Sequence, residues 1–269
     1  MTLRSMLFHI DDADAALRFV PPLLQFARDH QVRDLVAAAP GLLPDPLSAA
    51  AYPLAEAEAR KREMFDLLEI LQTRVSGAAR EFALDFRSAA VTDVTAFLLD
   101  QAGRCDLTVV RQHRSQATDL GQVDLARLVL QAGRPVLIVP REAAAIRIQR
   151  VVVGFKPCRE ARLALAAGLP LIGRAERVVV AALGENVAAS ALADAVDFLG
   201  AHGVQAEAWQ DEAVMDEEAA DVLLRIAAED DSDLIVAGAY GRGPVREAVF
   251  GGVTRTLLRQ TERACLLIH

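Results

Sequence analysis

Cysteine is scarce in this chain, and the spacings that build disulfide frameworks or metal sites are missing. The 269 residues include 3 cysteines, an odd number with no Cys-x-x-Cys pair. This pattern excludes a disulfide-rich secreted domain and points to a reducing, cytoplasmic compartment. The 5 histidines fall in no zinc-binding spacing, so we expect no metal site.

Long apolar runs and a positive net charge are also missing. No stretch approaches the roughly 18 apolar residues of a membrane span, and acidic residues follow the amino terminus before any apolar leader develops. The formal net charge is −8 and the sequence pI is about 5.2. Because such a field repels nucleic acids and anionic membranes, we expect neither as a partner.

Motifs for catalysis are absent as well. The sequence has no Gly-x-Ser-x-Gly elbow, and its glycine-rich segment lacks the Lys-Ser/Thr ending of a P-loop. Hydrolase or kinase chemistry therefore has no identified nucleophile or metal ligand. We expect that the protein is not an enzyme.

The composition is that of a globular protein, with 53% hydrophobic and 25% charged residues. Apolar runs of strand length alternate with segments of helical spacing, which predicts an α/β fold with parallel sheets. The strands expected in the first half cover residues 6–10, 35–39, 82–86, 107–110 and 135–139, and those in the second half cover 151–155, 178–182, 204–209, 234–237 and 265–268. We predict two tandem, doubly wound, five-stranded Rossmann-like domains.

The order of elements repeats, which indicates an internal duplication. Asp106-Leu-Thr-Val-Val is echoed by Asp233-Leu-Ile-Val-Ala, and Arg134-Pro-Val-Leu-Ile-Val by Arg263-Ala-Cys-Leu-Leu-Ile. We place the domains at residues 1–141 and 150–269, with a junction too short for free swinging. Since each copy ends in a strand at a sheet edge, we expect those two strands to pair about a pseudo-twofold axis.

Glycines at the end of the second copy suggest an anion site. Gly238, Gly241 and Gly251 have the spacing Gly-x2-Gly-x9-Gly, after an apolar strand and before a helical segment. Backbone amides of such a loop that have no hydrogen-bond partner, together with the start of the following helix, can bind phosphate. The alternative is that Gly238 and Gly241 make a tight turn and that Gly251 and Gly252 allow close helix packing.

This segment resembles the carboxyl-terminal signature of the universal stress protein family, whose nucleotide-binding members carry the same spacing followed by Ser or Thr. Thr254 matches a hydroxyl position of that ending, whereas Gly252 replaces a hydroxyl that contacts phosphate in ATP-binding relatives. The resemblance implies a site for ATP or another adenine nucleotide in the second domain. Its residues would be Gly238, Gly241, Arg242, Gly243, Gly251, Gly252, Val253 and Thr254.

The family's site also includes an Asp at the end of the first strand, beside the base or ribose. Asp11 occupies that position in the first copy, but Lys156 replaces it in the second, followed by Pro157 and Cys158. The first copy has no glycine after its fourth strand. One copy thus keeps the acid and the other keeps the loop. Lys156 would contact an anionic ligand or extend from the strand end into solvent.

Two main functions follow from the resemblance. The first is a stress-response regulatory protein that binds an adenine nucleotide in its second domain and acts through contacts with protein partners. The second is a nucleotide-free tandem scaffold. In either case the duplication implies an internal pseudo-dimer, and a homodimer of whole chains is compatible with the sequence.

Overall fold

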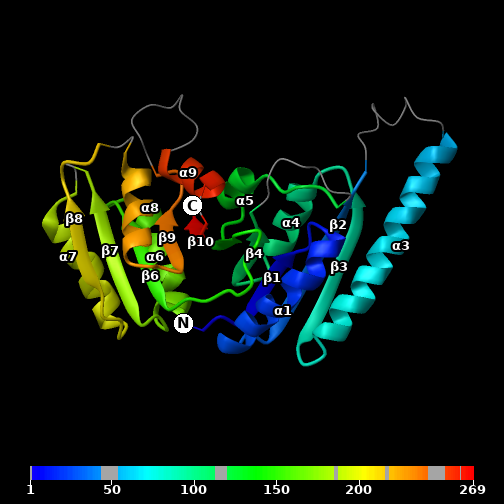
Figure 1. The fold of residues 1–269 in the computed structure, drawn as a ribbon, viewed down its shortest axis with the longest axis horizontal. Helices are drawn as coiled ribbons and strands as arrows, with labels where there is room; N and C mark the ends of the chain where they lie inside the picture. The colour runs from blue at the N-terminus through cyan, green and yellow to red at the C-terminus, as the bar shows by residue number, and fades with distance from the viewer. Residues whose placement is uncertain are drawn as a thin grey trace.

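The computed structural model describes residues 2–43, 54–112, 120–184, 187–215, 218–241, 252–260 and 262–269. Its strands form one ten-stranded sheet in the order β3-β2-β1-β4-β5-β10-β9-β6-β7-β8 (Figure 1). The first half comprises β1 (Ser5–His9), α1 (Ala13–Asp29), β2 (Asp34–Leu42), α3 (Leu54–Ala78), β3 (Ala83–Val91), α4 (Val94–Ala102), β4 (Leu107–Arg111), α5 (Leu125–Gln131) and β5 (Val136–Val139).

The second half repeats this order. It comprises β6 (Arg150–Phe155), α6 (Arg159–Ile172), β7 (Arg177–Leu183), α7 (Ala189–Ala201), β8 (Glu207–Asp211), α8 (Ala219–Glu229), β9 (Leu234–Gly238), α9 (Gly252–Gln260) and β10 (Ala264–Ile268). Within each half every strand pair is parallel. The predicted fold class, two tandem five-stranded α/β units, is confirmed.

The two halves meet at their last strands. β5 and β10 pair antiparallel, with Leu137 opposite Leu266 at the centre of the seam. This is the pairing that the two expected sheet edges predict, because each strand satisfies the backbone groups that the other leaves open. Gln112 adds a contact above the seam, where its side-chain amide donates to the carbonyl of Leu258 in α9 at 3.1 Å.

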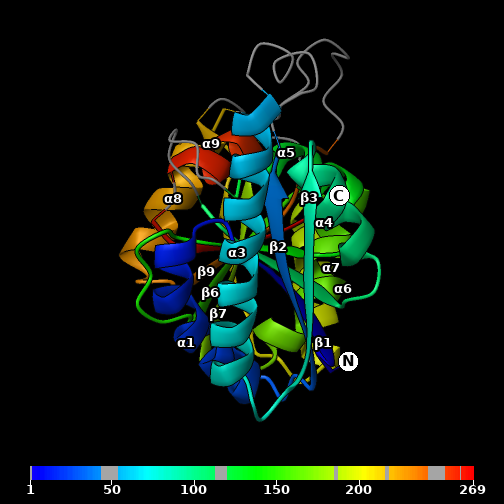
Figure 2. The ribbon, with the colours of Figure 1, turned by 90° about the vertical axis from the view of Figure 1, so that its right-hand side faces the viewer.

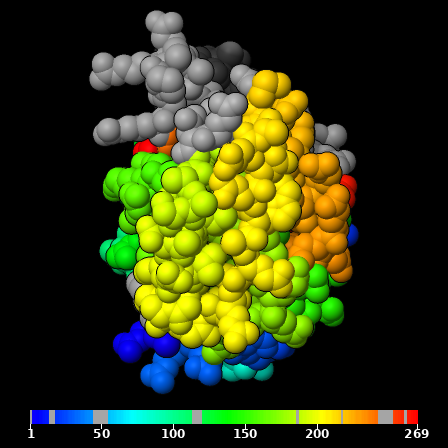
Figure 3. Space-filling model, turned by 90° about the vertical axis from the view of Figure 1, so that its left-hand side faces the viewer, coloured from blue at the N-terminus to red at the C-terminus, as the bar shows by residue number. Residues whose placement is uncertain are grey.

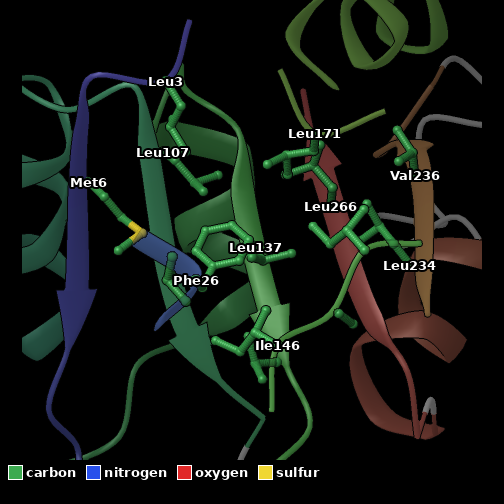
Figure 4. Close-up of a cluster of buried hydrophobic side chains, with 14 of the residues drawn as sticks. Leu3, Met6, Phe26, Leu107, Leu137, Ile146, Leu171, Leu234, Val236 and Leu266 are labelled. Atoms are coloured by element: carbon green, nitrogen blue, oxygen red, sulfur yellow. The ribbon is translucent and has the colours of Figure 1, made fainter. Parts of the chain in front are cut away.

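Helices cover both faces of the sheet, so the strands are apolar on both sides and rich in Val, Ile and Leu. On one face, α1, α3, α6 and α7 contribute to one buried cluster, and on the other, α4, α5, α8 and α9 contribute to a second. Both clusters continue across the seam. Figure 4 shows the first cluster there, with Leu107 and Leu137 of the first half near Leu171 and Leu266 of the second.

The repeated Asp-Leu motif has a structural role at the amino ends of the strands. The Asp106 carboxylate accepts hydrogen bonds from the amides of Arg4 and Ser5 at 2.9 and 3.0 Å. Asp233 accepts from the amides of Gln149 and Arg150 at the same two distances. Each aspartate therefore ties the start of one central strand to its parallel neighbour.

Several strand boundaries differ from the predictions. β2 runs to Leu42 and β3 to Val91, each beyond its predicted end, while β8 begins at Glu207 rather than at residue 204. Residues 44–53 lie outside the described chain. α1 continues through Pro21 and Pro22, although a proline inside a helix removes a backbone hydrogen bond. The helix persists because the neighbouring Phe19, Val20, Leu23 and Leu24 are all buried, which offsets the lost backbone hydrogen bonds.

The two edge strands of the sheet, β3 and β8, have different surroundings. α3 stands beside β3 at one end and lies in front of the sheet in Figure 2. At the other end, faced by Figure 3, the yellow surface belongs to α7 and β8. Arg177 pairs there with Glu207 of β8, which gives this edge strand a charged side chain.

Candidate functional site

The candidate site lies at the carboxyl end of β9, where open α/β sheets bind their ligands. Gly238 is the last residue of that strand. A Cβ atom there would lie 2.5 Å from both the amide nitrogen of Ala161 and the carbonyl carbon of Glu160, in the first turn of α6. Gly238 therefore allows the helix start to approach the strand backbone, which is the packing alternative recognised from the sequence.

The residues after Gly238 are held by elements on both sides. The amide of Ala239 donates to the carbonyl of Ile268 at 2.8 Å, and the His269 ring nitrogen Nδ1 is 3.0 Å from the carbonyl oxygen of Ala239. Tyr240 has a φ of +56°, and its amide donates to the Thr254 hydroxyl at 3.3 Å. The loop is thus fixed to β10 and α9 before it reaches Gly241.

This loop also adjoins the first half. The pKa of Tyr240 is raised, first by burial and second by the negative charge of Asp124. Asp124 caps the amino end of α5, where its side chain accepts from the amide of Arg127. In Figure 1, α5 and α9 lie next to each other above the seam, in agreement with their contacts. The site therefore lies near the interface of the two halves.

The other expected site residues differ in accessibility. Gly241 is exposed, and the space around a Cβ at Gly252 is open to 4 Å. Val253 is half-buried against the second core cluster. Thr254 is only 4% exposed, and its hydroxyl is engaged with Tyr240 as described. Arg242, Gly243 and Gly251 lie outside the described residues.

The start of α6 brings two further polar groups to Gly241. Cys158 is the N-cap residue and makes no side-chain capping bond. Its Sγ lies 3.2 Å, and the Glu160 Oε2 lies 3.5 Å, from the position of a Cβ at Gly241. Lys156, at the end of β6, is exposed. The second-half site therefore combines a glycine loop, a helix start, a thiol and a carboxylate.

The equivalent position of the first half is filled. Arg111 follows Val110 in β4 as Gly238 follows Ala237 in β9, and its Nε donates to the Asp11 carboxylate at 2.9 Å. The Arg111 and Asp11 side chains are only 3% and 6% exposed. The guanidinium also lies 5.4 Å from the centre of the Phe19 ring. Asp11, the acid that the resemblance places beside a ligand, is instead in a buried ion pair.

Sequence reasoning missed two of these residues. Arg111 had a signal, since the repeated Asp-Leu motifs align it with Gly238. Glu160 had none, because a glutamate in a first helical turn is common and favourable with or without a ligand.

Within the described chain, no group of three or more His, Cys, Asp or Glu side chains could hold a metal ion. Of the helices in that same part of the chain, none combines the length and apolarity needed to cross a bilayer.

Residues 205–269, which include the glycine loop, match the model of the Universal stress protein family. A universal stress protein structure from Archaeoglobus fulgidus DSM 4304 has a TM-score of 0.74 at 13% identity, with 99% of this chain and 96% of that chain covered. A putative universal stress protein from Pseudomonas aeruginosa UCBPP-PA14 has a TM-score of 0.59 at 16% identity, covering 99% and 93%. Among curated proteins no sequence gives a significant match. The full-length structural matches establish the fold.

Proposed function

We propose that the protein is a stress-response regulator with one adenine-nucleotide site, because residues 205–269 match the universal stress protein family model and the whole chain has the fold of universal stress proteins. We assign the site to the second half. Binding there would change how the protein contacts its partners, without catalysis. We place the protein in the cytoplasm and expect neither nucleic acid nor membrane among its partners.

One observation carries this proposal: the strand-end position of β9 holds a glycine that packs against the backbone of α6, whereas its counterpart in β4 holds an arginine in a buried ion pair. Gly238 lets the start of α6 lie against the strand end, and Gly241 just beyond it is exposed. Gly252 begins α9, and no described atom lies within 4 Å of a Cβ placed there. Arg111 and Asp11 fill the same region of the first half with a buried ion pair. We therefore keep the two-domain division proposed from the sequence. In this proposal residues 1–141 form a degenerate domain without a nucleotide site, and residues 150–269 form the nucleotide-binding domain.

The proposed phosphate contacts are the amides after Gly241 and those that begin α9. Amides at a helix start have no intrahelical partners and carry partial positive charge, which suits an oxyanion. Gly252 is the first residue of α9. The Thr254 hydroxyl accepts from Tyr240 and still has its own proton to donate.

The experiment is the identification of small molecules released from the gently purified protein, followed by calorimetric titration with ATP, ADP and AMP. We expect one site per chain and loss of binding in Gly241→Val. The substitution should leave the fold intact, because the atoms nearest the added Cβ are side-chain ends of Cys158 and Glu160. An empty protein that does not respond to added nucleotide contradicts the proposal.

A nucleotide-free scaffold is the second candidate, and specific residues favour it. Lys156 stands where the family's acid is expected, and Gly252 offers no hydroxyl. The continuous cores across the β5–β10 seam would make the two halves one rigid surface for protein partners. The titration separates the two candidates, because a nucleotide-free scaffold would show no binding heat and no rise in thermal stability when nucleotide is added.

A further inference from the structure

The Glu160 side chain lies at the start of α6, beside Gly241. Glu160 is 8% exposed, in the first turn of α6. Within the described chain, no group donates a hydrogen bond to it, and its ion-pair partner Arg159 reaches it only at 3.8 Å. The Arg159 side chain is itself 71% exposed, so its charge is largely screened by water.

A largely buried carboxylate is stabilised by hydrogen-bond donors and by nearby positive charge. The partial positive charge of the α6 amino terminus supplies some of this stabilisation. The direction of the side chain shows where more would come from, because Oε2 lies 3.5 Å from the Cβ position of Gly241. A ligand seated against Gly241 therefore meets a hydrogen-bond acceptor with a negative charge.

That charge discriminates between parts of a nucleotide. A hydroxyl or amino group donates to the carboxylate and is stabilised, whereas a polyphosphate chain is repelled at short range.

We propose that Glu160 sets the ligand class of the second-half site. Because of this carboxylate, the site binds adenosine or AMP in preference to ATP. The inference rests on the proposed function, because it concerns the same site. Glu160 acts on the ligand directly as an acceptor for a ribose hydroxyl or an amino group. Each additional phosphate then lowers the affinity.

The test is calorimetric titration of the wild-type protein, Glu160→Gln and Glu176→Gln with adenosine, AMP and ATP. The control Glu176 is exposed and lies beyond the opposite end of α6, so its substitution makes the same charge change away from the site. We expect Glu160→Gln to shift the ratio of ATP affinity to adenosine affinity by about tenfold in favour of ATP. Glu176→Gln should change the ratio less than about twofold.

An unchanged ratio in a folded Glu160→Gln protein overturns the inference while leaving the proposed function intact. If no ligand binds to either protein, the proposed function and the inference both fail. If Glu160→Gln does not fold, the affinities of the wild-type protein for adenosine, AMP and ATP test the inference. Adenosine or AMP binding more tightly than ATP supports the inference, and ATP binding most tightly overturns it.

Discussion

At the carboxyl edge of the sheet, the first half places Asp11 and Arg111, and the second half places Lys156 and Gly238 at the equivalent strand ends. The first pair is a buried ion pair. In the second half, the glycine instead admits the backbone of α6. Two copies with the same strand order have thus diverged at the one region where this fold binds ligands. A single strand-end position decides whether the region is filled by a side chain or approached by a helix start.

The largest expected effect comes from breaking the filled site. Arg111→Ala leaves the Asp11 carboxylate buried without its guanidinium, and we expect a loss of about 3–5 kcal/mol in the free energy of unfolding. Urea denaturation measures it. The control is Arg87→Ala, which removes an Arg–Asp pair with Asp85 on the exposed edge strand β3 and should cost less than about 1 kcal/mol. Equal losses in the two variants would show that the Asp11–Arg111 pair does not hold the first half together.

Gly238→Ala tests the open site by the opposite change. The added Cβ meets backbone atoms of Glu160 and Ala161, which cannot move without shifting α6. We expect a loss of about 1–3 kcal/mol. Gly252→Ala is the matched control, because none of the described residues has an atom within 4 Å of its Cβ, and it should change stability by less than about 0.5 kcal/mol. If thermal melting ranks the two variants equally, close approach is not the role of Gly238.

The aspartates that the two halves share should behave alike. Asp106→Ala and Asp233→Ala each leave two strand amides without their acceptor, and we expect similar losses of about 1–3 kcal/mol. Burial raises the pKa of Asp106, but hydrogen bonds from Arg4 and Ser5 outweigh it, so the net pKa is lowered. Its stabilisation is therefore present above the unfolded-state pKa and disappears as pH falls through the lower folded value.

Acid titration of stability checks this sign. The free energy of unfolding of the wild-type protein should decrease below about pH 4, and Asp106→Asn should make that decrease smaller. A variant as acid-sensitive as the wild-type protein would mean that Asp106 does not contribute to the acid response.

Gly252→Ser sharpens the difference between the halves by restoring a hydroxyl to the open site. The space at Gly252 accepts a side chain, and its φ does not fall in the left-handed region. One good hydrogen bond to phosphate should tighten ATP binding by about 1–2 kcal/mol. Calorimetry with Gly252→Ala as control measures the gain. No gain in a stable variant would show that the missing hydroxyl at Gly252 does not limit ATP binding.

The sequence predicted the fold well because its information is local and repeated. Apolar runs such as residues 234–237 identify strands, and two copies in the same order predict two sheets whose last strands pair. Burial overrode local rules in α1, where Pro21 and Pro22 do not interrupt the helix. Strand ends were harder to place, since β3 extends to Val91 although Arg87 and Ser88 interrupt its apolar alternation.

The candidate site was less predictable because it depends on contacts between distant segments. The role of Gly238 depends on Glu160 and Ala161, far away in the chain, and that of Asp11 on Arg111. The family resemblance gave Gly238 and Thr254 as ligand residues, whereas the structure places Gly238 against a helix backbone and Thr254 in a hydrogen bond with Tyr240. Their contribution to ligand binding stays a prediction.

The central claim is that only the second half of the chain binds a nucleotide. A crystal structure of the protein grown with AMP tests it most directly. The account predicts one nucleotide per chain, against Gly241 and the start of α9, with a hydroxyl or amino group facing Glu160. A nucleotide beside Asp11, or one in each half, would contradict it.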